Sequence, residues 1–466
     1  MSGKRQKNQD QLAFLFAGGS EAPASAAEGT ETPRTTREPE NPAGSQHLME
    51  EVCGTHVPCE RENLRAALKQ VRGNKGSPGI DGMTVDQLPD HLKQHWPTIR
   101  DQLLSGAYKP QAVRRVEIEK QDGSGMRKLG IPTVLDRFIQ QAVQQVLQKR
   151  WDPTFCDSTY GFRPGRSAHQ AVAQAQQYIA EGYIYVVDLD LEKFFDRVNH
   201  DKLMGQIAKR VEDKRLLKLI RAFLNAGVME GGLVSPSVEG TPQGGPLSPL
   251  LSNLVLDDFD RELQRRGHRF VRYADDCNIY VRSERAGQRV MESVKRFITT
   301  KLKLKVNESK SAVAKPQERK FLGFSFTSEP EPRRTIAPKA IQRFKERVRE
   351  ITRKAKGASM EQMMEALAHY VRGWRGYFGF CETPSVLKRL DAWLRRRARH
   401  AFWRQWKSGR KRFAELVRRG VSRESAAQAA GSHRGPWRVS QSPALDHALS
   451  NAYLASLGLP SLGAGR

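Results

Sequence analysis

The spacing of apolar residues divides the chain into a leader, a mixed body and a helical C-terminal part. Residues 20–47 are rich in Ala, Gly, Pro, Ser, Thr and Glu and hold almost no large apolar side chains. Such a segment cannot offset the entropy that is lost on ordering, so residues 1–47 are predicted to form a disordered leader. From residue 48 the pattern becomes globular, because Leu64, Leu68 and Val71 recur at helical spacing.

The body alternates between strand-like and helical patterns. Apolar runs predict strands over residues 113–118, 183–191, 270–273 and 278–281, and periodic runs predict helices over residues 135–148 and 168–180. This alternation predicts a mixed α/β body. After the Pro-rich stretch 329–332 only helical patterns follow, with Pro338 at one helix start and a capping box from Ser359 to Gln362 at another. A second, all-α domain is therefore predicted from residue 333.

The charge of the chain predicts a partner. Lys and Arg number 78 against 51 Asp and Glu, a formal net charge of +27, and residues 331–420 hold 25 Lys and Arg against 8 Asp and Glu, which leaves +17. This surplus predicts a polyanion, with nucleic acid first and an anionic membrane surface as the competitor. Mean hydropathy is -0.62 and no apolar run approaches bilayer-spanning length, so no membrane partner is expected.

Cysteine usage predicts a reduced, cytoplasmic setting. The five cysteines are scattered and form no C-x-x-C pair. Cys53 and Cys59 bracket His56, but three ligands in a loose segment are a weak metal signal, and no metal is predicted there. The apolar patch after the N-terminal basic residues is too short for the core of a signal peptide.

Two acids lie at the tip of a predicted hairpin. The runs 270–273 and 278–281 are β-prone, and the hairpin that they flank carries Tyr273, Ala274, Asp275 and Asp276. Adjacent carboxylates repel each other unless a divalent cation offsets their charge, and Mg²⁺ prefers oxygen ligands of this kind. The alternative is an exposed Asp-Asp turn without function.

Two further acids lie at the end of the strand predicted over residues 183–191. Asp188 and Asp190 are two positions apart, so they face the same side of the strand. Two-metal phosphoryl transfer needs acids from separate elements that converge on ions about 3.5 to 4 Å apart. Either acid could instead cap the following turn, and periodicity leaves open which of the two binds metal.

Seven sequence blocks connect these acids to a known family. They are residues 74–84 (NKGSPGIDGMT), 127–137 (RKLGIPTVLDR), 160–167 (YGFRPGRS), 190–196 (DLEKFFD), 241–249 (TPQGGPLSP), 304–310 (LKVNESK) and 320–324 (KFLGF). In this order they resemble the reverse transcriptases encoded by bacterial group II introns, over about residues 62 to 403. The resemblance implies an α+β right-hand polymerase, with fingers and an antiparallel palm sheet, followed by an all-α basic thumb or maturase domain.

The resemblance implies a catalytic role for four residues. Asp190, Asp275 and Asp276 would hold two Mg²⁺ ions, with the Leu191 backbone as a further candidate ligand, and Asp188 would support them from outside. Lys310 would protonate the leaving pyrophosphate or hold its charge. The alternative for Lys310 is an exposed lysine without a role.

The resemblance also implies the residues that bind a deoxynucleoside triphosphate. Phe195 would clash with a ribose 2′-hydroxyl, although it could be a core aromatic instead. The other candidates are Gln243 and Gly244 in the glycine-rich loop, Arg115, Lys120 and Arg127 beside a hairpin predicted around Asp122, and Tyr273. Any of the basic residues could instead be solvated surface.

Basic and aromatic residues of the helical part resemble the thumb or maturase domain of the same family. Residues 341–354 form an amphipathic pattern with a basic face, residues 370–378 (YVRGWRGYF) interleave Arg with aromatics, and residues 387–399 add an apolar stripe beside arginines. The predicted nucleic-acid contacts are Arg343, Arg347, Arg353, Arg372, Trp374, Arg375, Arg395 and Arg396. Packing of Trp374 in the core is the favoured alternative for that residue.

The full prediction is a reverse transcriptase that also acts as a group II intron maturase. It would bind intron RNA, assist its splicing and copy it from a DNA primer, with residues 48–332 as fingers and palm and residues 333–406 as thumb. Residues 407–466 would contact DNA or dock on the thumb, and a nuclease domain is expected to be absent because no cysteine follows Cys381. A splicing-only RNA binder and a defence-type or retron reverse transcriptase are the alternatives, and the oligomeric state stays open.

Overall fold

The computed structural model describes residues 47–53, 58–119, 125–230, 233–235, 239–241, 244–354 and 359–463, without the side chains of residues 58–61, 127 and 354. The leader predicted for residues 1–47 lies outside this range except for residue 47. Lys120, Gln243, the tip of the hairpin predicted around Asp122, and the side chain of Arg127 also lie outside it.

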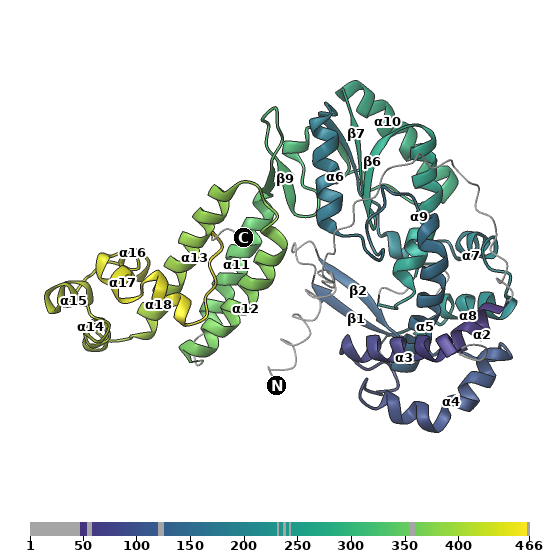
Figure 1. Ribbon diagram of the computed structural model, residues 1–466, viewed down its shortest axis with the longest axis horizontal. Helices are drawn as coiled ribbons and strands as arrows, with labels where there is room; N and C mark the ends of the chain where they lie inside the picture. Colours follow the sequence, from purple (N-terminus) through teal and green to yellow (C-terminus); the bar gives the residue numbers. More distant parts are fainter. Residues whose placement is uncertain are drawn as a thin grey trace. The chain divides into compact units, whose positions relative to one another are not determined.

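The described chain forms two compact units, one that ends at Lys315 and one that begins at Pro316. The hydrophobic core of the first unit draws on residues from Leu48 to Val306, and that of the second on residues from Ile336 to Leu462. Figure 1 shows a first unit of mixed helices and strands and a second unit that is almost wholly helical. A mixed α/β part followed by a helical region is thus confirmed, while the limits predicted at residues 332 and 406 stay predictions.

The first unit surrounds two sheets with helices. Its helices are α2 (Leu48–Cys53), α3 (Pro58–Gly73), α4 (Leu88–Leu104), α5 (Val134–Trp151), α6 (Ala168–Ala180), α7 (His200–Ala208), α8 (Lys214–Leu224), α9 (Ser248–Arg265) and α10 (Glu284–Phe297). The short turns are η2 (Asp152–Thr154), η3 (Phe194–Asp196) and η4 (Ile298–Leu302). Its strands are β1 (Val113–Glu119), β2 (Met126–Ile131), β3 (Tyr185–Leu189), β4 (Val228–Glu230), β5 (Leu233–Ser235), β6 (Arg269–Tyr273), β7 (Asp276–Val281) and β8 (Ala312–Ala314).

The two sheets of the first unit differ in strand direction. The order β2-β1-β4-β5 combines antiparallel pairs with one parallel pair, β1 with β4. The order β6-β7-β3-β8 is antiparallel throughout. Central β3 reads Tyr-Val-Val-Asp-Leu, and Val186, Val187 and Leu189 are buried because helices and sheet cover them. This second sheet carries the candidate acids.

The second unit is a helical region that begins with a strand pair. Its elements are η5 (Pro316–Glu318), β9 (Phe324–Phe326), β10 (Arg334–Ile336), α11 (Pro338–Lys354), α12 (Met360–Phe378), α13 (Pro384–Gln405), α14 (Gly409–Arg418), α15 (Arg423–Ala430), α16 (Pro436–Val439), α17 (Pro443–Ala448) and α18 (Asn451–Ser456). The start of α11 at Pro338 and the capping box of Ser359 and Gln362 at α12 confirm the predicted helix starts. The rings of Phe344 and Trp374 pack at 4.5 Å in its core.

Arginines of α13 fasten the C-terminal segment to the rest of the helical unit. Arg396 lies 3.9 Å from the ring centre of Trp437 and donates to its carbonyl at 2.9 Å. Arg399 is buried and donates to the Leu449 carbonyl at 3.0 Å, and it pairs with Asp446 at 2.7 Å. Each contact uses a charged donor in a partly dry environment, where such bonds are strong. The segment after α13 therefore docks on that helix.

Two features of the described chain bear on its surroundings. None of the helices in this part of the chain combines the length and hydropathy that a bilayer crossing requires. The thiols of Cys53, Cys156, Cys277 and Cys381 are free. Burial raises the pKa of Cys53 to about 12 and that of Cys277 well above its ordinary value, so both thiols stay protonated.

A half-buried histidine of α13 makes the stability of the chain depend on pH. Burial, together with Arg397, Arg404 and Arg396, lowers the pKa of His400 from 6.5 to about 4. Between about pH 6.5 and pH 4, His400 binds a proton in the unfolded chain but not in the folded chain. The free energy of unfolding therefore decreases as the pH is lowered through this range. We expect the melting temperature to drop less between about pH 7.5 and 5 in His400→Gln than in the wild type.

Thermal unfolding followed by circular dichroism measures this difference. The exposed His433 supplies the control, because His433→Gln should keep the pH dependence of the wild type. An identical drop in His400→Gln and the wild type would contradict the assignment to His400.

Candidate active site

The hairpin predicted around Asp275 and Asp276 is formed by β6 and β7. Tyr273 pairs with Asp276, so the turn consists of Ala274 and Asp275 and is two residues shorter than the predicted one. Ala274 has a φ of 58°, a left-handed conformation that is unfavourable for residues with a Cβ. Arg272 offsets this strain, because its Nη1 donates to the Ala274 carbonyl at 2.7 Å.

Arg272 is fully buried beneath the hairpin and paired with an acid of α9. Its Nη2 and Nε donate to Asp260 at 2.5 and 2.7 Å, and Nη1 also donates to the Asn253 amide oxygen at 3.1 Å. Burial alone would lower the pKa of Arg272, but the Asp260 carboxylate outweighs it and raises the pKa. The guanidinium therefore stays charged and ties the turn to α9.

The register of β3 and β7 brings the strand acids to the hairpin. Leu189 lies opposite Cys277 at the last pair of the ladder, so the next residue of each strand is Asp190 on one side and Asp276 on the other. Asp188 lies one pair inside the ladder, opposite Asn278. The three predicted ligands Asp190, Asp275 and Asp276 thus lie at one end of the antiparallel sheet.

A loop between η4 and β8 encloses Asp190. Asn307 donates to its carboxylate from Nδ2 at 2.9 Å and to its carbonyl from the backbone at 2.8 Å. Ser311 Oγ accepts from its backbone N–H at 3.0 Å, and the Lys310 ammonium lies 3.6 Å from Oδ2. Leu191 follows as a bridge to Val306. The predicted pair Asp190 and Lys310 is brought together, and Asn307 is a neighbour that sequence reasoning missed.

The second strand acid, Asp188, has a different environment. With the Asn278 amide oriented to satisfy its hydrogen bonds, Nδ2 donates to Asp188 at 3.1 Å. Burial raises the pKa of the adjacent Tyr280, and the Asp188 charge adds to that rise. Asp188 is thus held within the ladder, whereas Asp190 lies where the ladder ends.

The acids suit a divalent metal in chemical type and backbone placement. Carboxylates are the oxygen ligands that Mg²⁺ prefers, and three of them lie at adjoining strand ends and a turn. Among the described residues, however, no three acid, imidazole or thiol side chains are gathered closely enough to hold an ion. Side chains at the sheet end would therefore have to turn toward one another to share a metal.

Phe195 lies beside the start of the glycine-rich loop. It belongs to η3 and is half-buried, while Phe194 is 2% exposed and packs against it at 5.2 Å. The Thr241 backbone donates to the Phe195 carbonyl at 2.7 Å. Gly240 has a φ of 91°, and a Cβ there would lie 2.9 Å from the same carbonyl. Only glycine fits at this crossing.

A buried histidine supports the same crossing and was not predicted. His200 is 4% exposed at the start of α7. Its Nε2 lies 2.6 Å from the Gly240 carbonyl, and its Nδ1 lies 3.2 Å from the Asn225 side chain. A histidine at the first position of a helix gives no sequence signal for a long-range contact. The contact between His200 and Gly240 is therefore visible only in the structure.

The other predicted nucleotide-binding residues lie near β1 and β2. Arg115 pairs across the sheet with Gly130 and forms an ion pair with Glu230 at 2.9 Å. A Cβ on Gly244, whose φ is 139°, would lie 2.6 Å from the Gly130 carbonyl. Arg115 and Gly244 are thus both close to one position of β2.

The last predicted nucleotide-binding residue, Tyr273, lies at the catalytic hairpin and is half-buried. Burial raises the pKa of its hydroxyl.

The first two sequence blocks pack against each other. The Arg137 guanidinium donates to the Ser77 carbonyl at 2.7 Å, and a Cβ on Gly79 would lie 2.5 Å from the Thr133 backbone. Asp136 accepts from Thr133 at 2.7 Å, and burial raises its pKa. Both blocks therefore contribute to the packing of the first unit.

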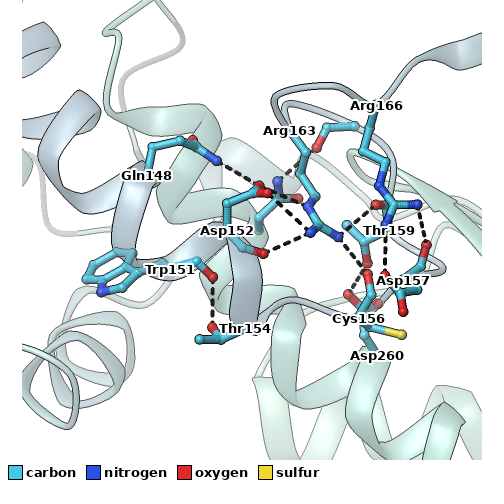
Figure 2. Close-up of polar contacts among 12 residues, drawn as sticks. Gln148, Trp151, Asp152, Thr154, Cys156, Asp157, Thr159, Arg163, Arg166 and Asp260 are labelled. Atoms are coloured by element: carbon cyan, nitrogen blue, oxygen red, sulfur yellow. Dashed lines mark hydrogen bonds and ion pairs between the residues drawn. The ribbon is translucent and has the colours of Figure 1, made fainter. Parts of the chain in front are cut away.

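The third block forms a loop around a buried arginine, as Figure 2 shows. Arg163 donates to the Asp152 side chain at 3.0 Å and to the carbonyls of Cys156 and Thr159 at 2.7 and 3.2 Å. Arg166 pairs with Asp157 at 2.7 Å. Thr159 in turn donates to Asp260 at 2.7 Å. The block thus connects to the pair of Asp260 and Arg272.

The arginines predicted to contact nucleic acid fall into two groups. Arg353 and Arg372 are exposed, whereas Arg395 is 7% exposed and donates to Asp391 at 2.7 Å. Arg396 holds Trp437, as described above, and Trp374 is 9% exposed within the core. The remaining three, Arg343, Arg347 and Arg375, are half-buried, and Arg347 pairs with Glu350 at 2.7 Å.

The helical unit also contains a cavity of about 670 Å³ between α12, α13, α14 and α18. Aromatic and basic side chains line much of it, among them Arg372, Phe402, Trp406, Lys411 and Tyr453. Acids of α12 and α14 also contribute to the lining. Its size is that of pockets that hold small ligands.

Comparisons with known proteins agree with both units. Residues 118–326 match the family described as "Reverse transcriptase (RNA-dependent DNA polymerase)" and residues 341–420 match "Group II intron, maturase-specific domain". "Protein YkfC" of Escherichia coli is 38% identical over 44% of this chain and 55% of its own length. "Group II intron-encoded protein LtrA" of Lactococcus lactis is 30% identical over 55% of this chain and 54% of its own length.

The chain spans about half the length of these curated relatives. Among solved structures, a chain of the "Partial Cas6-RT-Cas1--Cas2 complex" matches 54% of this chain and 42% of its own at 24% identity, with a TM-score of 0.35. The two matched domains follow each other in this chain, the reverse transcriptase domain first and the maturase-specific domain second. The chain therefore combines a reverse transcriptase domain with a group II intron maturase-specific domain.

Proposed function

We propose that this protein is an RNA-directed DNA polymerase that also acts as a group II intron maturase. The observation that carries the proposal is the meeting of Asp190 with the Asp275 and Asp276 hairpin at one end of an antiparallel sheet, within a reverse transcriptase domain. The maturase-specific domain that follows supports the second role. In this proposal the first unit supplies fingers and palm, and α11 to α13 supply the thumb.

The carboxylates at the sheet end would hold two Mg²⁺ ions. Reverse transcriptase domains depend on divalent metal, which when bound activates the primer 3′-hydroxyl and neutralises the triphosphate charge. Asp190 and the hairpin acids would share this task, since they approach from separate elements. Asn307 would keep the Asp190 carboxylate oriented through its bond of 2.9 Å.

Lys310 is placed to handle the charge of the leaving group. Its ammonium lies 3.6 Å from Asp190, and its side chain is 56% exposed, so it can turn toward a triphosphate. A lysine in that position stabilises the pyrophosphate as the bond to it breaks, or gives it a proton. The Lys310 pair with Asp190 would keep the ammonium near the metals before the nucleotide arrives.

Phe195 would select the sugar of the incoming nucleotide. The Gly240 crossing fixes its backbone, and the half-buried ring projects from a short turn after Asp190. A ring held in this way beneath the sugar would collide with a ribose 2′-hydroxyl. The proposal therefore names deoxynucleoside triphosphates as substrates.

The helical unit would bind the intron RNA and the template with its primer. Residues 331–420 carry a surplus of 17 positive charges, which favours a polyanion that releases counterions on binding. Exposed Arg353 and Arg372 are suited to phosphate contacts, and Arg372 also lines the cavity beside aromatic rings. Arg395 and Arg396 act within the unit, because Arg395 bonds to Asp391 and Arg396 bonds to and stacks on Trp437.

Replacing both hairpin acids tests the polymerase site. Asp275→Asn with Asp276→Asn should reduce cDNA synthesis on an RNA template by roughly 10³-fold or more, because the metals lose their ligands. Affinity for intron RNA and support of splicing should stay near the wild-type level. Exposed Asp86 and Asp90 provide a control of equal charge change, since their double replacement by Asn should leave synthesis intact. Undiminished cDNA synthesis in the hairpin variant would refute the site, and loss of RNA binding would refute the separation of roles.

Shortening Phe195 tests the sugar gate. Phe195→Ala should raise the use of ribonucleotides relative to deoxynucleotides by about tenfold or more, since space for the 2′-hydroxyl opens. Phe195→Leu keeps most of the bulk and should change selectivity less. Primer extension with each nucleotide type measures the ratio, and unchanged selectivity in the alanine variant would assign Phe195 to packing alone.

Two kinds of arginine variant separate RNA contact from internal support. Arg353→Ala with Arg372→Ala should weaken RNA binding and lower the slope of log affinity against log salt by about 1.5, with an unchanged melting temperature. Arg395→Ala should lower the melting temperature instead, because it removes the positive charge that pairs with the half-buried Asp391 carboxylate. The reverse result, with stability lost in the first variant and affinity lost in the second, would contradict this division.

A further inference from the structure

The loop of the third sequence block lies directly against the catalytic hairpin. Tyr160 donates its backbone N–H to the Arg272 carbonyl at 2.9 Å, and Arg272 donates its own to the Ser158 carbonyl at 2.9 Å. Thr159 and Arg272 thus form a parallel bridge along the outer side of β6. The loop continues with Gly161, whose carbonyl accepts from Asn253 of α9 at 2.8 Å.

Gly161 leaves no space between the loop and the turn. A Cβ at this position would lie 2.2 Å from the Ala274 backbone nitrogen and 2.9 Å from the Tyr273 carbonyl carbon. Both neighbours are backbone atoms, so they can yield only if the turn itself moves. Gly161 is therefore the point where the loop sets the position of the hairpin.

Buried polar bonds hold the turn from the opposite side. Arg272 holds the Ala274 carbonyl, and its partners Asp260 and Asn253 both belong to α9. Thr159 donates to Asp260, so the loop is bonded to α9, which in turn is bonded to Arg272 of β6. Figure 2 shows Thr159 and Asp260 beside Arg163. The four buried polar members, none more than 1% exposed, are Thr159, Asn253, Asp260 and Arg272.

We propose that these four residues and Gly161 form a hairpin clamp, a positioning device that sets the place of Asp275 and Asp276 relative to Asp190. The inference rests on the proposed function, because it assigns the clamp to the metal site of that function. The members touch neither metal nor substrate. They act through the turn backbone: Gly161 lies close against the nitrogen of the strained residue Ala274, and Arg272 donates a hydrogen bond to its carbonyl.

Groups that orient metal ligands from behind typically change metal affinity by about 10 to 100-fold when they are altered. The clamp differs from a merely structural core in one measurable respect. Displacing the turn should weaken metal binding while the fold and the RNA-binding surface stay intact. Stability alone would change melting temperature without a shift in metal requirement.

Gly161→Ala tests the clamp in the full chain. The probe is Mn²⁺ titrated into the protein with an RNA template and a chain-terminated DNA primer, with free Mn²⁺ followed by electron paramagnetic resonance. We expect about tenfold weaker Mn²⁺ binding, and a matching increase in the Mg²⁺ concentration for half-maximal primer extension. Affinity for the RNA should stay within about twofold of the wild type. Gly205→Ala is the matched control, since Gly205 is exposed on α7 with nothing within 4 Å of its Cβ position.

Thr159→Val gives a second variant that removes one bond and keeps the side-chain shape. It should shift Mn²⁺ binding in the same direction by a smaller factor, and it decides the question if circular dichroism shows Gly161→Ala to be unfolded. Wild-type Mn²⁺ binding in the folded variants would overturn the clamp alone. A wild-type protein that extends no primer would instead overturn the proposed function, and the clamp with it.

Discussion

The buried pair of Arg272 and Asp260 is the interaction on which the site depends. Both side chains are at most 1% exposed, and an isolated charge at that depth would be strongly destabilising. Their mutual bonds, together with Asn253 and Thr159, satisfy the guanidinium and let it hold the carbonyl of the turn. This support allows Ala274 to adopt a left-handed conformation at the tip of the hairpin. Asp275 and Asp276, which follow it, are thereby held in place.

Asp190, which follows β3, is also held by hydrogen bonds from a neighbouring segment. Asp190 has its backbone and its carboxylate bonded to one loop, through Asn307, Lys310 and Ser311. Two separately braced elements thus meet at the end of β3 and β7. Phosphoryl transfer by metals needs this combination, because ligands from different elements must converge with little freedom. In the proposed function the helical unit binds the nucleic acid, to which its surplus of positive charge is suited.

Sequence patterns predicted the local elements well and the long-range contacts poorly. The span of α6 and the starts of α11 and α12 follow from periodicity and caps, which are local properties of the chain. The support by Asp260, Asn253 and His200 could not be predicted, since each reaches its partner across many residues. Arg272, a charged residue within the apolar run 270–273 that precedes Asp275 and Asp276, was the sequence signal for a buried ion pair. Basic charge also leaves the role of Arg395 open, because periodicity does not distinguish an arginine that meets phosphate from one that bonds within the protein.

Mapping where a divalent metal binds is the sharpest test of the proposed metal site. Fe²⁺ in place of Mg²⁺, with ascorbate and peroxide, generates radicals that cut the protein backbone beside the bound ion. With template and primer present, we expect cuts near Asp190 and near Asp275, and we expect these cuts to disappear when Asp275 and Asp276 are both replaced by Asn. Cuts confined to other parts of the chain, or cuts at these strands that survive the replacement, would contradict the proposed metal site.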